Sequence, residues 1–496
     1  MMEKPQHNPA AISRRQFLKY TALAGAASVL AACGANTGST PTPSSQQAAS
    51  SPGTSLPTPT VVSSQHLGSN AFDWQKYKGT SLKLLLNKHP YADALVADLQ
   101  TFTDLTGIRV TYDIFPEDVY FDKVTTALSS RSSQYDALMT GAYQTWVYGP
   151  ANWLVDLRQY IQDENLTNPD FDVQDFIPNI LHSDSWSGKP GEAPGQGDAK
   201  QWALPFGFEI NSLSYNKQVF AKHKLRVPRT LPEIIETAEY ISKKEANMYG
   251  IGVRGSRSWA TIHPGFLSAY TCYHARDFDD HLKAAMNSPQ AVEMTKLWVQ
   301  MIKKGGPPTW TQYTWYEVGN DLGAGKSAMI YDADILGYFQ NRGTKAAGHI
   351  GWAPVAANPD DPKAYANVWI WSLAMSNFSN HKEATWYFLQ WATGKAHLLK
   401  GAVEGDQVDP VRHSVANHPK VVAKLKQKYP GYLESFNQLI PNSKIYFTPQ
   451  PLFFDVTTDW AATLQKMVTS GADVKASLDE LAESINKKMA DAGITQ

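Results

Sequence analysis

The stretch that decides the fold is "LKLLLNKHPYADALVADLQTFTDLTGIRVTYDIF", residues 82–115. It begins with a mostly apolar run that ends on Asn87, a pattern typical of a buried strand. Residues 92–107 have apolar side chains at helical spacing, and the final glycine suits a helix C-cap. Residues 108–115 then alternate like a second strand. A strand, a helix and a strand at this spacing predict a parallel βαβ unit.

The same alternation continues downstream of this unit. Residues 118–130 predict a second helix, and residues 135–141 predict a third buried strand. Ligands of open α/β sheets lie beyond the carboxyl ends of the strands. This rule places Asn87, Gly141 and Tyr143 near a cleft.

The rest of the chain predicts a second set of elements. An extended run at residues 202–217 lacks a helical period and is long enough to cross between two lobes. We further expect helices at residues 231–244, 289–304, 381–394 and 473–493, and strands at 249–255, 327–333 and 369–375. The sequence therefore predicts an α/β protein of two lobes, each a mixed sheet flanked by helices. The expected lobes are residues 71–208 with 329–372, and 209–328 with 373–496; the expected crossings lie near 205–211, 328–332 and 371–374.

The N-terminus has the pattern of a targeting segment. Arg14 and Arg15 precede a short apolar run at residues 20–32, too short to span a bilayer as a mature helix. Leu-Ala-Ala-Cys at residues 30–33 resembles a bacterial lipoprotein cleavage box, and the paired arginines resemble a twin-arginine export signal. We expect residues 1–32 to be a lipoprotein signal peptide and residues 33–70 to be a lipidated Cys33 followed by a disordered tether. The mature protein is then extracytoplasmic and anchored to the cell membrane.

Composition excludes several classes of protein. A net charge of −1 supplies no basic surplus to neutralise phosphates, so a nucleic-acid partner is not expected. With Cys33 used for lipidation, Cys272 is alone, which excludes an intramolecular disulfide and a cysteine metal cluster. We expect no cofactor, no metal and no catalytic residue. The expected ligand is a small molecule that is either uncharged or met by local charges only.

One stretch imitates a phosphate-binding loop. "GNDLGAGKS", residues 319–327, has Asn320 where the first glycine of that loop is required, and no apolar strand precedes it. We expect a helix end that turns into a strand. Neither a zinc-protease motif nor a nucleophile elbow is present in the sequence. The sequence cannot show whether two carboxylates lie together in space. The hypothesis of a hydrolase is therefore weakened and not eliminated.

The tryptophans fall into two groups. Four lie within apolar helical patterns and are expected in the core: Trp298, Trp386, Trp391 and Trp460. Four others lie at strand ends or in loops beside polar residues: Trp259, Trp315, Trp369 and Trp371. A ring in such a place can stack on the C–H face of a sugar or polyol while polar side chains bond the hydroxyls. Nearby polar candidates for that role are Arg254, Tyr316 and Asp332.

Residues 82–490 resemble the family 1 extracellular solute-binding proteins of ABC importers, and most of all their sorbitol/mannitol branch. The similarity rests on "FTDLTGIRV", "YDALMTGAYQTWVYGPANWLVDL", "LPFGFEINSLSYNKQVF", "GIGVRGSRSW", "LGAGKSAMIYDA" and "WIWSLAMSNFSNHKEATWYFLQWAT", which follow one another in the family's order. The resemblance implies a type II periplasmic-binding-protein fold. It also implies capture of a sugar or polyol in the cleft, delivery to the transmembrane subunits of an ABC permease, and a monomeric protein.

The resemblance also implies a set of ligand-binding residues. The matching positions are Asn87, Tyr143, Glu209, Arg254, Trp259, Trp315, Asp332, Trp369 and Arg412, to which the residue patterns add Tyr316 and Trp371. Gln144 and Thr145 stand where the polyol branch often has an acidic residue, and "DQVDPVR" is more acidic than its counterpart. The ligand therefore stays open between a polyol and a larger saccharide. A lipid-anchored carbohydrate-active enzyme and a receptor for another class of solute are the alternatives.

Overall fold

The computed structural model describes residues 72–495. The expected signal peptide, the lipidated Cys33 and the tether lie outside the described residues. Among the described residues, no helix has both the length and the apolar character needed to span a bilayer.

The predicted βαβ unit is present. β1 (Ser81–Asn87) and β2 (Arg109–Phe115) pair in parallel, with α2 (Pro90–Thr106) between them. His89 caps the start of α2 by accepting a hydrogen bond from the Tyr91 amide at 3.2 Å, and Pro90 occupies the first turn. Gly107 ends the helix at a φ of 70°, a conformation that glycine adopts without strain. Local sequence signals therefore set both ends of this helix.

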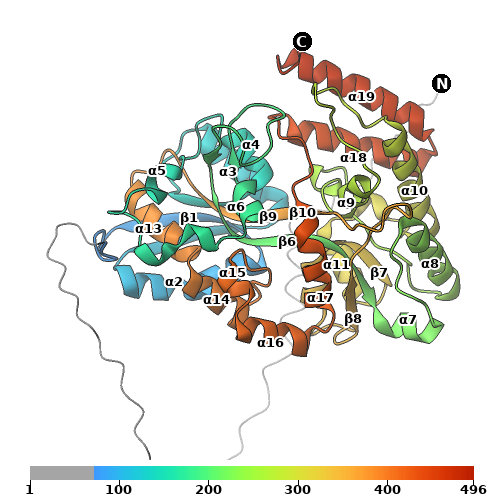
Figure 1. Ribbon diagram of the computed structural model, residues 1–496, viewed down its shortest axis with the longest axis horizontal. Helices are drawn as coiled ribbons and strands as arrows, with labels where there is room; N and C mark the ends of the chain where they lie inside the picture. The colour runs from blue at the N-terminus through green and yellow to red at the C-terminus, as the bar shows by residue number, and fades with distance from the viewer. Residues whose placement is uncertain (1–71, 496) are drawn as a thin grey trace, which may run out of the picture. The chain divides into compact units, whose positions relative to one another are not determined.

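One mixed sheet runs through the whole described body (Figure 1). Its strand order is β2-β1-β3-β9-β6-β7, with β8 added beside β6 and β10 beside β9. β6 and β9 are antiparallel to each other and lie at the centre of the sheet. The other strands of the structure are β3 (Ala137–Gly141), β6 (Leu204–Asn216), β7 (Met329–Ala333), β8 (Ile350–Ala353), β9 (Ala366–Met375), β10 (Ser443–Lys444) and a separate pair, β4 (Ser185–Trp186) with β5 (Lys200–Gln201).

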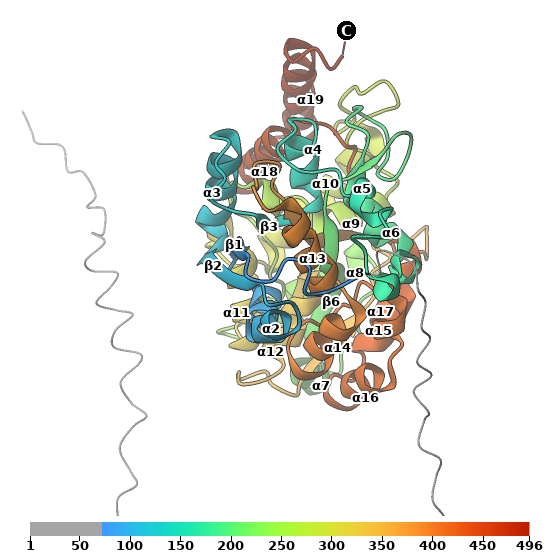
Figure 2. The ribbon, with the colours of Figure 1, turned by 90° about the vertical axis from the view of Figure 1, so that its left-hand side faces the viewer.

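Helices flank the sheet in two groups, which define the first lobe and the second lobe. The first lobe, built on β1, β2 and β3, contains α2, α3 (Glu117–Ser129), α4 (Ala142–Tyr148), α5 (Arg158–Ile161), α6 (Pro178–Ser183), α13 (Lys382–Ala392) and α14 (Lys395–Glu404). The second lobe, built on β7 and β8, contains α7 (Lys217–His223), α8 (Leu231–Lys244), α9 (Gly265–Cys272), α10 (Pro289–Gly305), α11 (Trp315–Gly323), α12 (Asp334–Gln340), α18 (Phe453–Ser470) and α19 (Val474–Asp491). Short helices α15 (His413–Ala416), α16 (Pro419–Lys428) and α17 (Tyr432–Leu439) link α14 to β10. Figure 2 looks onto the first lobe, with α3 and α4 toward the top and α14 and α16 toward the bottom.

The segments in which the chain crosses between the lobes differ in part from the predicted ones. β6 is the first crossing, as expected, because its first half pairs with β9 and its second half pairs with β7. β7 does not cross, since it lies wholly beside the second half of β6. The chain returns through β9, whose end pairs with β3. Residues 329–353 therefore belong with the second lobe, and residues 382–404 pack against α2 in the first lobe.

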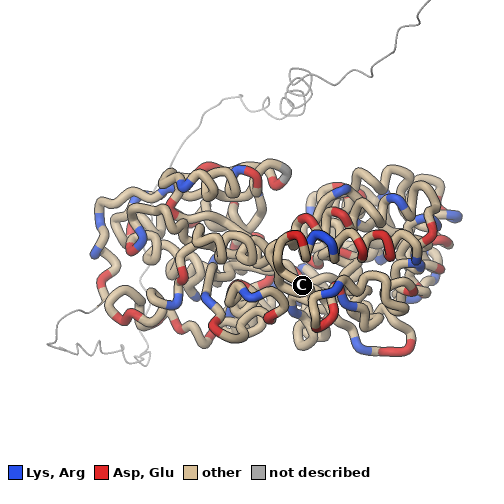
Figure 3. Tube along the Cα trace, turned by 90° about the horizontal axis from the view of Figure 1, so that it is seen from above, with Lys and Arg blue, Asp and Glu red and all other residues tan. Residues whose placement is uncertain are grey.

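The third passage is the segment that contains β10. This short strand pairs with the start of β9 at Ala366 and Asn367, and it lies between the two groups of helices (Figure 1). It leads from α17 into α18 of the second lobe. Figure 3 shows lysines and arginines mixed with acidic residues along the trace of both groups.

Two further sequence predictions are confirmed, and the strand expected at residues 249–255 is confirmed only in part. Trp298, Trp386, Trp391 and Trp460 are all buried in the core. The imitation phosphate loop is the end of α11 followed by the turn into β7. The strand expected at residues 249–255 forms only single bridges, at Tyr249 and Gly252. Its backbone passes so close to α8 that a Cβ on Gly250 would lie 2.1 Å from the Ala238 carbonyl oxygen.

A buried carboxyl group makes the stability of the first lobe depend on pH. Asp184 follows α6, is fully buried and accepts a hydrogen bond from Ser372 of β9 at 2.6 Å. Burial raises the pKa of Asp184 to about 8, and the Ser372 bond lowers it only in part. Folding therefore binds a proton that the unfolded chain releases above about pH 4, so the free energy of unfolding falls from about pH 4 to about pH 8.

The variant Asp184→Asn is expected to remove this dependence. Its stability relative to the wild type should rise with pH by up to about 1.4 kcal/mol per pH unit in that window and level off above it. Urea unfolding followed by circular dichroism across the window measures the difference. Parallel curves for the two proteins would show that Asp184 stays ionised in the folded state.

Candidate binding site

A narrow cavity lies between the two lobes at the crossing strands. Its volume of about 20 Å³ is close to the space that the centre of one water molecule needs. Both lobes and both long crossing strands contribute to its lining. The lining residues are His89 and Glu117 from the first lobe, Glu209, Trp369 and Trp371 from β6 and β9, and Arg254, Trp259, His263, Trp315, Ile335 and Leu336 from the second lobe.

The crossing strands supply an acidic group and two rings. Glu209 of β6 lies opposite Trp369 of β9 in the antiparallel register. The Trp371 indole N–H donates to Glu209 Oε1 at 2.8 Å, and His89 Nε2 lies 3.6 Å from the same oxygen. The His89 Nδ1 atom already accepts the bond that caps α2, so its Nε2 carries the proton. Among the described residues, the second Glu209 oxygen is left available as an acceptor.

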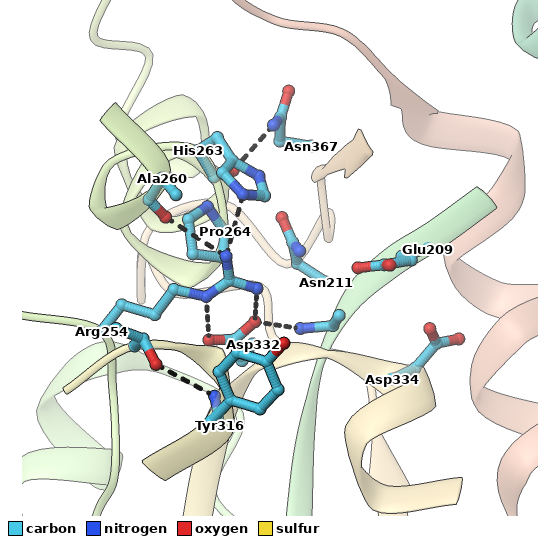
Figure 4. Close-up of polar contacts among 12 residues, drawn as sticks. Glu209, Asn211, Arg254, Ala260, His263, Pro264, Tyr316, Asp332, Asp334 and Asn367 are labelled. Carbon is cyan, nitrogen blue, oxygen red and sulfur yellow. Dashed lines mark hydrogen bonds and ion pairs between the residues drawn. The ribbon is translucent and has the colours of Figure 1, made fainter. Parts of the chain in front are cut away.

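Arg254, which lines the cavity, is held in place by a buried ion pair with Asp332 (Figure 4). Its Nε and Nη2 donate to the two oxygens of Asp332 at 2.9 and 2.7 Å. Arg254 is 7% exposed and Asp332 is 0% exposed. Burial acts against the charge, but Asp332 outweighs it and raises the pKa of Arg254 above its ordinary value. The guanidinium is therefore a fixed, charged donor.

Within residues 72–495, the remaining bonds of Arg254 engage all but one of its N–H groups. Nη1 donates to the Ala260 carbonyl at 3.3 Å and contacts His263 Nε2 at 3.1 Å. A guanidinium has five N–H groups in a fixed plane. Four of them are thus engaged, and the fifth lies on Nη2.

Aromatic rings form the walls. Trp259 and Trp369 lie 5.3 Å apart, and Trp369 meets Trp371 at 5.1 Å and 81°. Trp315 stacks on Tyr316 with a centroid distance of 3.8 Å. Rings at steep angles to one another give a ligand apolar faces on more than one side.

Several polar atoms at this place are buried without a hydrogen-bond partner among the described residues. They are the indole nitrogens of Trp315 and Trp369, Nδ1 of His263, and both side-chain polar atoms of Gln144. Gln144 lies near the Trp369 ring, because a Cβ on Gly141 would meet both side chains. Buried polar groups in folded proteins are nearly always paired, and an unpaired one costs about 1–3 kcal/mol. Such a concentration is typical of a site whose partners come from a ligand.

The structure brings most of the predicted site residues together. Glu209, Arg254, Trp259, Trp315, Trp369 and Trp371 line the cavity. Asp332 holds Arg254, and Tyr316 stacks on Trp315. Tyr143 lies behind the wall, with its ring 5.4 Å from Trp369 and its hydroxyl donating to the Val368 carbonyl. Asn87 is buried at the end of β1 and does not line the cavity; its side chain has no partner among the described residues.

Arg412 lies elsewhere. Its Nε donates to the Thr393 carbonyl at 2.7 Å and its Nη1 to the Asp172 carbonyl at 2.8 Å. The guanidinium also lies 3.8 Å from the ring centroid of Phe176, and the side chain is 0% exposed. Arg412 therefore joins segments of the first lobe and does not reach the cavity.

The sequence reasoning missed five lining residues. His89 follows β1 and Glu117 follows β2, so the strand-end rule applied to every strand would have found both. Ile335 and Leu336 lie in the first turn of α12, which begins at Asp334 directly after β7. His263 comes four residues after Trp259, and only its tertiary contact with Arg254 distinguishes it from a buried core histidine.

Two lobes on shared strands, with an aromatic and polar cavity between them, define a ligand-binding protein of the periplasmic type. Residues 87–397 match the family of bacterial extracellular solute-binding proteins. An "Erythritol/L-threitol-binding protein" of Mycolicibacterium smegmatis is 39% identical over 96% of this chain and 97% of its own length. A "Mannitol-binding protein" of Pseudomonas aeruginosa is 25% identical over 63% of this chain and 66% of its own length.

Solved structures show the same fold. A solute-binding protein of an ABC transporter from Agrobacterium radiobacter, in complex with ribitol, superposes with a TM-score of 0.72 at 20% identity, covering 83% of this chain and all but 1% of the other. One from Agrobacterium vitis with bound D-mannitol has a TM-score of 0.69 at 25% identity, covering 84% of this chain and 99% of that chain. The protein belongs to the bacterial extracellular solute-binding protein family. It is a binding protein and not an enzyme.

The N-terminus also matches a known signal. Residues 11–31 match the signal sequence of the twin-arginine translocation pathway, as the paired arginines predict. The protein is therefore exported and works outside the cytoplasm.

Proposed function

We propose that the protein captures a small neutral polyol between its lobes and delivers it to the transmembrane subunits of an ABC permease. The observation that carries this proposal is the group of buried, unpaired polar atoms on the aromatic walls. Each hydroxyl of a polyol both donates and accepts, so one short molecule can pair with several of these atoms. Its C–H faces can pack on the rings of Trp259, Trp315 and Trp369.

Charge supports a neutral ligand. The Arg254 guanidinium is compensated by Asp332 at hydrogen-bond distance, so it brings no net positive charge to the cavity. Glu117 and Glu209 are both lining residues and both acidic. A sugar acid would meet these carboxylates, and like charges in a poorly hydrated site repel. A neutral polyol meets no such penalty.

The size of the cavity supports a ligand with a short carbon chain. The cavity is narrow, and a solute enters only as side chains or lobes move apart. A four- to six-carbon chain needs a smaller displacement than an oligosaccharide. The relatives named for erythritol, L-threitol and mannitol, and the solved complexes with ribitol and D-mannitol, hold ligands in this range.

Binding in this position couples to lobe closure. The lining residues come from both lobes, so the full set of contacts exists only when the lobes are together. A ligand that makes those contacts shifts the population toward the closed form. We propose that the closed form is the one that the permease recognises.

The location follows from the N-terminus. We propose that Cys33 is lipidated, that residues 34–70 tether the body outside the membrane, and that the body is monomeric. Loss of membrane association in a Cys33→Ser variant, measured by fractionation of cells, tests the anchor.

Titration calorimetry tests the ligand class. The wild type is expected to bind at least one of erythritol, L-threitol, ribitol and D-mannitol with a micromolar dissociation constant, about 8 kcal/mol of binding free energy. Trp369→Ala should abolish the heat, because the variant loses both a wall and an indole donor. Trp298→Phe, in a buried ring remote from the cavity lining, is the matched control for loss of stability and should bind as the wild type does. Absence of heat from the wild type with every polyol would reject the proposed function.

A further inference from the structure

His263 forms part of the cavity wall between the aromatic rings of the second lobe and of β9. It follows the short helix η3 (Trp259–Thr261), and its ring is 2% exposed. The imidazole stacks on Trp259 at 5.6 Å and 28°, and it lies 5.4 Å from Trp369. It therefore stands between two of the rings that form the walls.

The contact with Arg254 determines which ring nitrogen of His263 carries the proton. Arg254 Nη1 can only donate, so His263 Nε2, at 3.1 Å, must accept. Burial and the Arg254 charge together hold the pKa of His263 well below its ordinary value, so the ring is neutral. A neutral imidazole with an accepting Nε2 carries its hydrogen on Nδ1.

This hydrogen has no acceptor within the described part of the protein. Nδ1 is buried and unpaired, although the ring lines the cavity. The backbone carbonyl of the same residue accepts a hydrogen bond from the Asn367 amide at 2.7 Å (Figure 4). The Asn367 amide also donates to the Tyr143 hydroxyl. The residue is thus held at its carbonyl oxygen and at Nε2, and its Nδ1–H is left unpaired among the residues that the structure describes.

We propose that His263 is a specificity-determining ligand contact: its Nδ1–H donates to one hydroxyl oxygen of the bound polyol, while its Nε2 fixes the guanidinium of Arg254. The inference rests on the proposed function. The free Nη2 hydrogen of Arg254 donates to the same ligand, so the second lobe presents two donors in a fixed arrangement. A solute that lacks the matching hydroxyl leaves the Nδ1–H unpaired and is discriminated against.

Two substitutions separate the roles of the two ring nitrogens. In His263→Gln the longer amide reaches the position of Nε2 and can still accept from Arg254, but nothing stands at Nδ1. In His263→Asn the shorter amide can donate from the position of Nδ1, and the Arg254 bond is lost. A residue that served only to support Arg254 would make Asn the more harmful change. The proposal requires the opposite order.

The experiment is calorimetry with erythritol and its monodeoxy analogues. His263→Gln is expected to weaken erythritol binding by about 10-fold, with His263→Asn closer to the wild type. One monodeoxy analogue should lose a similar factor against the wild type and lose nothing further against His263→Gln. Equal affinities of the wild type and His263→Gln for erythritol would overturn the inference and leave the proposed function standing, whereas a wild type that binds no polyol would reject both.

A measurement on the wild type tests the proposal even if the variants fail to fold. Long-range ¹H–¹⁵N spectra of histidine-labelled protein report which imidazole nitrogen is protonated. We expect an Nδ1–H form of His263 whose resonance moves when erythritol is added. A proton on Nε2, or an Nδ1 signal unchanged at saturation with erythritol, would contradict the proposal.

Discussion

Asp332→Asn is expected to lower the free energy of unfolding by about 3–5 kcal/mol. Asp332 is fully buried, and its two oxygens accept from Nε and Nη2 of Arg254 while Oδ1 also accepts from the Ala333 amide. The amide side chain keeps the shape of the carboxylate but removes its charge. The Arg254 guanidinium then stays charged and buried without a counter-ion, which is the costly way to break a buried pair. Binding of erythritol should weaken as well, since Arg254 loses the partner that orients it.

Chemical unfolding with a double-variant cycle measures this effect. Arg254→Met with Asp332→Asn removes both charges, and this double variant should recover most of the stability lost in Asp332→Asn. It should not recover polyol binding, because the guanidinium donor is gone. The denaturant slopes of all the proteins must agree for the comparison to hold. A double variant as unstable as the single one would show that charge burial is not the cause.

Arg412→Met is expected to destabilise the protein by about 3 kcal/mol or more without changing the polyol affinity of the folded molecules. The substitution leaves the buried carbonyls of Thr393 and Asp172 without their donor. It also removes the guanidinium from the face of Phe176 and from Asp175, whose Oδ2 lies 3.6 Å from Nη1. These contacts join a segment that precedes α6 to the end of α13, all within the first lobe. Burial lowers the pKa of Arg412 to about 10, so the side chain is charged at neutral pH.

Arg412→Lys is the matched control for this prediction. The ammonium keeps the positive charge but cannot reach both carbonyls with a planar fork, so we expect an intermediate loss of stability. Thermal unfolding gives the stability of each protein, and calorimetry below the transition gives the erythritol affinity. An Arg412→Met protein that is folded and as stable as the wild type but has lost polyol binding would return Arg412 to the ligand-binding set.

Local patterns were sufficient for most of the secondary structure. The helix expected at residues 231–244 is α8 with the same bounds, because a capping box at Thr230 and Glu233 and a clear apolar stripe both lie in the local sequence. The alternating pattern of β2 and the long extended run of β6 also predicted these strands from the local sequence. The strand expected at residues 249–255 is an exception, because Gly250 packs directly against α8 and the segment forms only single bridges.

The sequence predicted the aromatic part of the binding site correctly. Rings next to polar residues at strand ends marked Trp259, Trp315, Trp369 and Trp371, and all four line the cavity. Arg254 and Arg412 were both assigned to the ligand-binding set, Arg254 from its place at a predicted strand end and Arg412 from the family resemblance alone. Only the fold separates a guanidinium that faces the cavity from one that ties two backbone segments together.

By itself the sequence determined the export signal, the α/β class, most element bounds and the aromatic character of the site, because each depends on residues close together in the chain. The tertiary structure alone decided that the chain returns through β9 and that Asp332 sits behind Arg254. It also decided that His263 meets Arg254, whose charge, together with burial, lowers the pKa of the imidazole. These features depend on the direction in which a distant strand enters the sheet and on which buried groups then meet, and neither is encoded in local spacing.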